Sequence, residues 1–198
     1  MTIDKKAIEK FLKNKKNRLM IQIISIPLIL LIAYSMVVSS LNRSAEKYKL
    51  NKALDQLASL SNAIHQNYAT QEDYKGLDNY SLQANAIVPS DMQGKNNNII
   101  HAYNGDVVTR SIPLHHSKDG AFVIIYNGLN QEACVSLLAS IPSAGGLAGI
   151  DVAPIYAETH KTAKPRVEAK ALPFPQEQAK LLCEAQTDPT NAIIWIFY

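Results

Sequence analysis

The side chains with the most evident chemical capacity are five histidines, at His65, His101, His115, His116 and His160. His115 and His116 are adjacent and precede Ser117-Lys118-Asp119, in a segment that we expect to form a hairpin loop. A zinc site gathers ligands from spaced positions and often includes cysteine. Because the adjacent pair lacks that spacing, we predict a solvated loop there and no metal site.

Cys134 and Cys183 are the two cysteines of the chain. If the compartment that holds them is oxidising, they are the available disulfide pair. Closing a loop of about 50 residues would stabilise the fold by roughly 4 kcal/mol in the chain-entropy treatment. Two buried free thiols are the alternative. The predicted topology, given below, favours the disulfide.

Catalytic and nucleotide-binding patterns are weak. Residues 145–149, Gly-Gly-Leu-Ala-Gly, are followed by no Lys-Ser/Thr pair, so the segment 143–149 is better interpreted as a flexible loop than as a phosphate cradle. No serine nucleophile elbow is present, and the carboxylates Glu132, Asp151 and Glu158 cannot be paired from sequence. We therefore expect no catalytic residue, no cofactor and no small-molecule substrate, and hence not an enzyme.

An uncharged segment near the start of the chain determines on which side of a membrane the residues after it would lie. Residues 19–42 carry no charge, and as a helix they would span roughly 35 Å against about 30 Å of hydrocarbon. Residues 1–18 hold seven basic and two acidic side chains, and basic flanks stay on the cytoplasmic side. We predict a cytoplasmic basic segment at 1–18, a transmembrane helix at 19–41 and an exported domain at 42–198.

A cleaved secretory signal is the alternative to this anchor. The apolar core of such a signal is usually about 7–15 residues long and is followed by small residues at a cut site. The present segment is longer, and Ser39-Ser40-Leu41 is a poor cut site. Within the span, Pro27 should kink the helix. Gln22 lies near the cytoplasmic interface, with a hydrogen bond to another helix as the second interpretation.

The positive charge of the chain belongs to its membrane flank. The formal net charge is +3, but residues 19–198 hold 13 basic and 15 acidic side chains. A nucleic-acid surface would need the opposite distribution, so no nucleic-acid partner is expected.

The predicted helix extends beyond the membrane, from about residue 4 to residue 69. An apolar stripe at helical spacing predicts one face that packs on a sheet, formed by Leu50, Leu54, Leu57, Ile64 and Tyr68. The opposite face should be solvated and carries Lys49, Lys52, Gln56, Ser59 and Asn67.

The rest of the chain shows strand patterns mixed with short helices. Asn104-Gly105 between 99–103 and 106–112 is a strong hairpin signal. A further strand is predicted at 121–126, and the apolar run 191–197 predicts a central strand. Short helices are expected at 79–85, 130–141 and 175–185, and residues 151–172 should be irregular with one or two short edge strands. These elements predict an α+β fold in which the outer half of the long helix packs on a mainly antiparallel sheet.

This organisation resembles the type IVb branch of the type IV pilins, which includes toxin-coregulated pilins and the thin-pilus pilins of conjugative plasmids. The resemblance extends over residues 45–198 and rests on the order and spacing of several stretches. They are 74–77 (Tyr-Lys-Gly-Leu), 86–92 (Ala-Ile-Val-Pro-Ser-Asp-Met), 102–107, 122–128, 131–134 and Cys183 followed by 191–197. The resemblance implies a structural protein whose partners are other pilin or pilus and secretion-apparatus proteins and the lipid bilayer.

The start of the chain departs from that family. A prepilin is cut after a glycine and carries a glutamate at the fifth mature position, whereas the first glycine here is Gly76 and no acidic residue lies between Glu9 and Glu46. If the chain is uncut, packing its basic tail into an apolar filament core would bury charges at a penalty of several kcal/mol each. We therefore expect a pilin-like component of a pilus, conjugative or secretion apparatus in the inner membrane of a Gram-negative bacterium, with its domain in the periplasm. A processed filament subunit and a binding or adhesion module that presents loops 113–120 and 143–149 are the alternatives.

Overall fold

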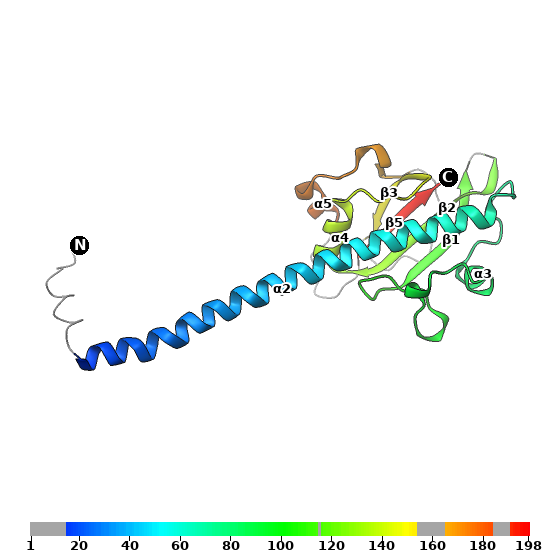
Figure 1. Cartoon of the computed structure of the whole chain (residues 1–198). Helices are drawn as coiled ribbons and strands as arrows, with labels where there is room; N and C mark the ends of the chain where they lie inside the picture. Colours follow the sequence, from blue (N-terminus) through cyan, green and yellow to red (C-terminus); the bar gives the residue numbers. More distant parts are fainter. Residues whose placement is uncertain (1–14, 115, 154–164, 184–190) are drawn as a thin grey trace. The chain divides into compact units, whose positions relative to one another are not determined.

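The computed structural model describes residues 15–114, 116–153, 165–183 and 191–198 (Figure 1), with side chains from residue 30 onward apart from that of Asn97. The predicted basic segment therefore lies mostly outside the described residues, as do the side chains of Gln22 and Pro27. The chain divides into two compact units, Met1–Lys47 and Tyr48–Tyr198. The helices are α2 (Lys15–Tyr68), α3 (Asn79–Ala84), α4 (Gln131–Leu138) and α5 (Gln176–Leu182), with short 3-10 turns η1 (Ser90–Met92), η2 (Lys95–Asn97) and η3 (Ala169–Ala171).

Helix α2 is continuous from Lys15 to Tyr68 and passes through Pro27. Apart from that proline, its sequence contains no helix breaker, which agrees with the single long helix that the pattern predicts. Among the residues that the structure describes, none of the helices combines the length and the apolar character that a membrane crossing requires.

The five-stranded sheet of the second unit has the order β1-β2-β5-β3-β4, and every pairing in it is antiparallel. Its strands are β1 (Val107–Leu114), β2 (Ser117–Leu129), β3 (Leu147–Ala153), β4 (Val167–Glu168) and β5 (Asn191–Phe197). Strand β5 lies between β2 and β3, and all of its residues are buried. The prediction of a central strand at 191–197 is therefore confirmed, as is the α+β fold.

Side-chain alternation along β2 divides the apolar residues between two clusters. Phe122, Ile124 and Tyr126 belong to the cluster that includes the outer part of α2, whereas Val123 and Ile125 belong to a second cluster. Successive side chains of a strand point to opposite faces of the sheet, so β2 is buried on both of its faces. A strand that is buried on both faces has a continuous apolar sequence, which explains why apolar and polar residues do not alternate over residues 121–126.

One predicted strand and one predicted loop need correction here. The strand predicted over 99–103 is wrong: residues in this region form only isolated bridges, between Gln93 and Ile99 and between Ile100 and Asp106. The turn itself is present, because Asn104 has a φ of 61° and the Asn104 amide donates to the His101 carbonyl at 2.8 Å. The segment 143–149 was predicted to be entirely loop, but β3 begins at Leu147.

Strand β1 is an edge strand, and part of its edge is closed by the side chain of Asn79 at the start of α3. The Asn79 amide nitrogen donates to the Val107 carbonyl at 2.7 Å, and the Asn79 amide oxygen accepts from the Thr109 backbone amide at 2.7 Å and from the Thr109 hydroxyl at 2.8 Å. An exposed edge is a template for pairing with another chain. The side-chain amide occupies the backbone groups that such pairing would use.

Replacing Asn79 with alanine should therefore lower the free energy of unfolding by about 2 kcal/mol, because Thr109 is buried and loses its partners. The measurement is urea unfolding of the purified full chain, followed by the fluorescence of its single tryptophan, Trp195. Asn85→Ala, at the exposed other end of α3, is the matched control and should change the free energy by less than about 0.5 kcal/mol. Equal losses in the two variants would contradict the edge-closing role.

Candidate functional site

The outer part of α2, residues 48–68, lies across one face of the sheet (Figure 1). Leu57, Leu60 and Ile64 are completely buried in the shared core, and Leu50 and Leu54 are partly buried against it. The predicted apolar stripe thus lies on the side of the helix that meets the sheet, and its burial increases along the helix from Leu50 to Ile64.

Two polar contacts fix α2 at this position. The buried Tyr126 hydroxyl on β2 donates to the Ala53 carbonyl at 3.1 Å, and burial raises the pKa of this hydroxyl, so it remains a donor. The Gln56 amide nitrogen donates to a carboxylate oxygen of Asp91 at 2.8 Å. Gln56 was predicted on the solvated face and is only 3% exposed, because the 3-10 turn η1 covers it.

The part of α2 that precedes this unit exposes large apolar side chains. Between 49% and 69% of the residue surface is accessible at Leu30, Leu31, Ile32, Tyr34, Met36, Val37 and Leu41. Contiguous exposed apolar residues on a helix indicate contact with lipid or with another protein. Residues 30–41 are therefore the described surface with the clearest need for a partner, and we call them the apolar segment of α2.

The predicted disulfide is present in the structure and joins α4 to the end of α5. The Cys134 and Cys183 sulfurs are 2.02 Å apart, and both residues are completely buried. Helix α4 is capped by Asn130, whose side-chain oxygen accepts from the Ala133 amide at 2.8 Å. The Gln131 amide nitrogen also donates to the Cys183 carbonyl at 3.0 Å, so α4 holds the end of α5 by a hydrogen bond as well as by the disulfide.

The histidines occupy separate structural positions. His65 on α2 shares a hydrogen bond of 3.0 Å with the Tyr74 hydroxyl and packs edge-on against Phe122, and burial lowers its pKa. His116 is exposed beside the β1–β2 turn, while His115 and His160 lie outside the described residues. Among the residues that the structure describes, no group of three potential ligands could hold a metal ion.

His101 is buried under the Asn104 turn and is held in one neutral tautomer. Its Nε2 lies 2.7 Å from the Asn127 carbonyl, to which it donates, and its Nδ1 accepts from the Tyr103 amide at 3.2 Å. Its ring stacks on Tyr126 with centroids 4.7 Å apart. Burial lowers the pKa of His101 to about 4, although the Asn127 carbonyl and Asp106 act in the opposite direction.

His101 should make the fold sensitive to acid. Its pKa is about 4 in the folded chain against 6.5 when unfolded, so its contribution is complete above pH 6.5 and is lost as the pH falls towards 4. The full loss corresponds to about 3 kcal/mol. Urea unfolding of the wild type and of His101→Gln at pH 7.5 and at pH 4 measures it. The wild type should lose about 3 kcal/mol more than the variant between the two pH values, and parallel losses would contradict the assignment.

The glycines at 145–149 have a structural role, which is clearest at Gly146. Gly146 has a φ of +73°, and a β-carbon there would lie 2.7 Å from Nε2 of His65 and 3.0 Å from the Tyr198 carbonyl. The Tyr198 amide donates to the Gly146 carbonyl at 3.0 Å. Glycine is thus required by a left-handed backbone in a crowded site.

The carboxylates named from the sequence do not come together. Glu132 lies exposed in the first turn of α4, and Asp151 on β3 pairs with Arg166 at 3.1 Å. Glu158 lies outside the described residues. The prediction of a loop at 113–120 is wrong for most of its residues, because β1 extends to Leu114 and β2 begins at Ser117. The Ser117 hydroxyl donates to a carboxylate oxygen of Asp73 at 3.2 Å.

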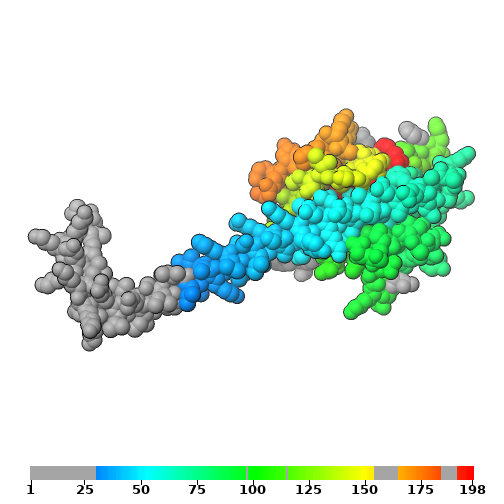
Figure 2. Space-filling view, viewed as in Figure 1, coloured from blue at the N-terminus to red at the C-terminus, as the bar shows by residue number. Residues whose placement is uncertain are grey.

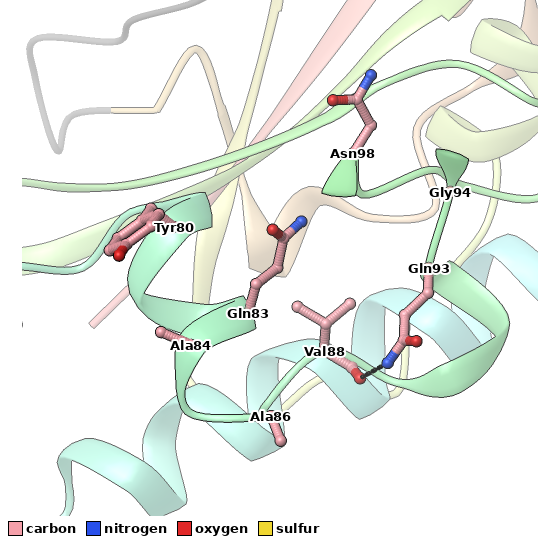
Figure 3. A pocket seen from close by; sticks show the side chains of 8 residues that line it. All are labelled: Tyr80, Gln83, Ala84, Ala86, Val88, Gln93, Gly94 and Asn98. Carbon is pink, nitrogen blue, oxygen red and sulfur yellow. Dashed lines mark hydrogen bonds between the residues drawn. The ribbon is translucent and has the colours of Figure 1, made fainter. Parts of the chain in front are cut away.

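Sequence patterns did not indicate one hollow of the surface. It has a volume of about 360 Å³ and is lined by α3, the turn after it and the loop at 93–98 (Figure 3). Its lining residues are Tyr80, Gln83, Ala84, Ala86, Val88, Gln93, Gly94 and Asn98. No charged residue is among them.

The fold places the chain in a structural class. It resembles the crystal structure of the type IVb pilin from Salmonella typhi, with a TM-score of 0.50 and 18% identity over 73% of this chain and 97% of that chain. It also resembles the crystal structure of TcpA, a type IV pilin from Vibrio cholerae El Tor biotype, with a TM-score of 0.55 and 19% identity over 76% and 99% of the two chains. The fold is that of a type IV pilin.

The family model named Bundlin matches residues 43–196, which is most of the chain. This protein therefore belongs to the bundlin family of type IVb pilins, and the resemblance inferred from the sequence is confirmed. A search of curated proteins gives no match. The family and fold are those of structural subunits, so the chain is a pilin-like protein.

Proposed function

We propose that this protein is a pilin-like structural component of a type IVb pilus or of a related conjugative or secretion apparatus. Residues 19–41 anchor it in the bacterial inner membrane, residues 1–18 stay in the cytoplasm and the globular unit lies in the periplasm. The observation that carries the proposal is the apolar segment of α2, which is exposed on a helix whose outer part belongs to a pilin fold.

The charge distribution and the disulfide support this orientation. Seven basic side chains precede the uncharged segment, and such flanks resist transfer across the membrane. Cys134 and Cys183 form a disulfide, which persists in an oxidising compartment such as the periplasm. Within the membrane, Gln22, Pro27 and the apolar residues around them would contact the helices of other apparatus proteins.

A pair of reporters fused after Tyr198 tests the orientation. Alkaline phosphatase is active only after export, whereas green fluorescent protein exported unfolded by the general secretory route stays dark. We expect an active phosphatase and a dark fluorescent protein. The opposite pattern would place the domain in the cytoplasm and overturn the proposal.

Cross-linking tests the assembly role. Leu41→Cys introduces a thiol into the exposed apolar segment of α2, and a short bismaleimide applied to cells should join this chain to a second copy or to another pilus protein. Gln71→Cys, exposed just after α2, is the matched control and should give much less product. Equal yields from the two positions would show that the apolar segment has no preferred protein contact.

A processed filament subunit is the second candidate, because a filament core would also bury the apolar segment of α2. Intact-mass measurement of the protein from cells separates the two. Loss of about the first 18 residues supports the filament subunit, and an intact basic segment supports a resident membrane component.

A further inference from the structure

The apolar segment of α2 ends in a shallow groove. The groove has a volume of about 440 Å³ and is lined by Ser35, Met36, Ser39, Ser40 and Arg43, so we call it the Arg43 groove. Figure 2 shows the blue part of α2, in which these residues lie, as a single helix. All five residues belong to the unit Met1–Lys47, so the groove is complete without the globular unit.

Three side chains of the Arg43 groove offer hydrogen-bond donors. Residues three and four apart are neighbours on a helix surface, so the hydroxyls of Ser39 and Ser40 lie beside the guanidinium of Arg43. Arg43 is exposed, and in the part of the chain that the structure describes no carboxylate lies within ion-pair distance of it. The hydroxyls of Ser39 and Ser40 have no acceptor among the described residues either. These donors are therefore available to a ligand.

The donors suit the oxygen atoms of a phosphate group. A guanidinium presents a planar fork of N–H groups that can bind two phosphate oxygens at once, and it remains charged at every relevant pH. A serine hydroxyl donates one further hydrogen bond. No acidic side chain lines the Arg43 groove, so an anion would meet no opposing charge there.

Towards its other end the Arg43 groove becomes apolar. The Ser35 hydroxyl donates to the Ile32 carbonyl at 2.8 Å, so its donor is already used. Met36 and Ile32 are 68% and 49% exposed, and covering such surface with hydrocarbon is favourable. A molecule that joins a phosphate to acyl chains therefore matches both ends of the groove, whereas free inorganic phosphate matches only one.

The expected depth of the groove in a bilayer points to the same ligand. Residues 19–42 carry no charge. If this segment is centred on roughly 30 Å of hydrocarbon, the residues from about 21 to 40 lie within the hydrocarbon. Ser39 and Ser40 then lie at its outer boundary, and Arg43 lies at the level of the headgroups, where the phosphates of a phospholipid are.

We propose that the Arg43 groove binds the phosphate of a phospholipid in the outer leaflet of the membrane. This inference rests on the membrane anchoring proposed above and adds a specific lipid contact to it. Because the phosphate and the acyl chain bind to the same helix face, the lipid holds α2 at one depth and one rotation in the bilayer.

Solid-state NMR tests the contact on the full chain, reconstituted in vesicles of phosphatidylglycerol and phosphatidylcholine. With carbon-13 at the guanidinium carbons, dipolar dephasing by lipid phosphorus-31 reports arginines that contact phosphate. Arg43→Lys should lower the dephasing about twofold, because Arg18 at the other end of the uncharged segment supplies the rest. Arg110→Lys, at an exposed position on β1, is the matched control and should leave it unchanged. Equal dephasing in the wild type and in Arg43→Lys would contradict the proposal.

Flotation of the same vesicles separates this inference from the proposed function. A chain that does not float with the vesicles overturns both the anchor and the lipid site. A chain that floats but shows no dephasing that depends on Arg43 overturns the lipid site alone.

Native mass spectrometry after mild detergent extraction identifies the ligand. The wild type should retain phosphatidylglycerol and little monogalactosyl diacylglycerol, which has acyl chains but no phosphate. Ser39→Ala with Ser40→Ala should lower the retained phospholipid about tenfold, because hydrogen bonds to a charged group are lost. Ser44→Ala is the control and should have no effect, since the Ser44 hydroxyl already donates to the Ser40 carbonyl at 3.1 Å. Equal retention of the two lipids, or displacement of the phospholipid by inorganic phosphate, would contradict the assignment.

Discussion

Removing the disulfide by Cys134→Ala together with Cys183→Ala is expected to lower the free energy of unfolding by about 4 kcal/mol. The two cysteines are 49 residues apart in sequence, and opening so long a loop restores conformational freedom to the unfolded chain. Alanine is chosen because both sites are completely buried, where serine hydroxyls would need partners. Thermal unfolding should show a midpoint about 10 °C lower.

The reduced wild type is the natural comparison for this double variant. Treatment with a thiol reductant should produce nearly the same loss, because it opens the same loop without changing the side-chain volume. A double variant whose unfolding midpoint equals that of the oxidised wild type would show that the hydrogen bond from Gln131 to Cys183 and the packing of α4 and α5 are sufficient by themselves.

The second large effect is expected at the contact between helix and sheet. Leu57→Ala should lower the free energy of unfolding by about 4 kcal/mol, because Leu57 is completely buried and its removal leaves a cavity between α2 and the sheet. Urea unfolding monitored through Trp195 measures the loss, since this residue lies in the same core cluster.

Two positions on the same helix act as controls for Leu57. Leu54→Ala removes the same atoms from a partly buried site and should lower the free energy of unfolding by less than half as much. Asp55→Ala, which is exposed, should change it by less than about 0.5 kcal/mol. A loss at Leu54 equal to that at Leu57 would contradict the gradient of burial along α2.

Elements whose signal is local and strong were predictable from sequence. The long run without Gly or Pro that carries the apolar stripe predicts the outer part of α2, and the apolar run at 191–197 predicts the central strand β5. Asn130 was recognisable as a cap because its side chain acts within its own turn. In each case the residues that decide the structure are neighbours in the sequence.

Features that depend on distant residues were missed. The Asn104 turn formed as its sequence indicates, but β1 pairs with β2 over seven residue pairs and leaves 99–103 with isolated bridges only. Gln56 is buried because the chain folds back and places Asp91, 35 residues later in the sequence, in hydrogen-bond contact with it. The role of Asn79 requires knowledge of which strand is the edge. Propensity and periodicity cannot supply these tertiary pairings.

The candidate functional features also include some that the sequence predicts and one that it does not. Helical periodicity predicts the burial of Leu57 and Ile64, and the presence of two cysteines predicts that Cys134 pairs with Cys183. The hollow beside α3 is not predicted, because its amides lie on separate segments and none belongs to a recognised motif. The Schellman motif that ends α3 places Ala86 at a φ of 52°, and residue types alone do not indicate it because glycine is the usual residue at that position.

The position of β5 has a consequence for the order in which the sheet can form. Strands β1 and β2 can form their hairpin as soon as they emerge, but β3 pairs with β5 rather than with β2. Because β5 follows both in the chain, the two halves of the sheet stay separate until residues 191–197 arrive. A chain that lacked this strand would leave the edges of β2 and β3 unpaired, so we expect it to be cleaved by proteases more readily than the chain that contains β5.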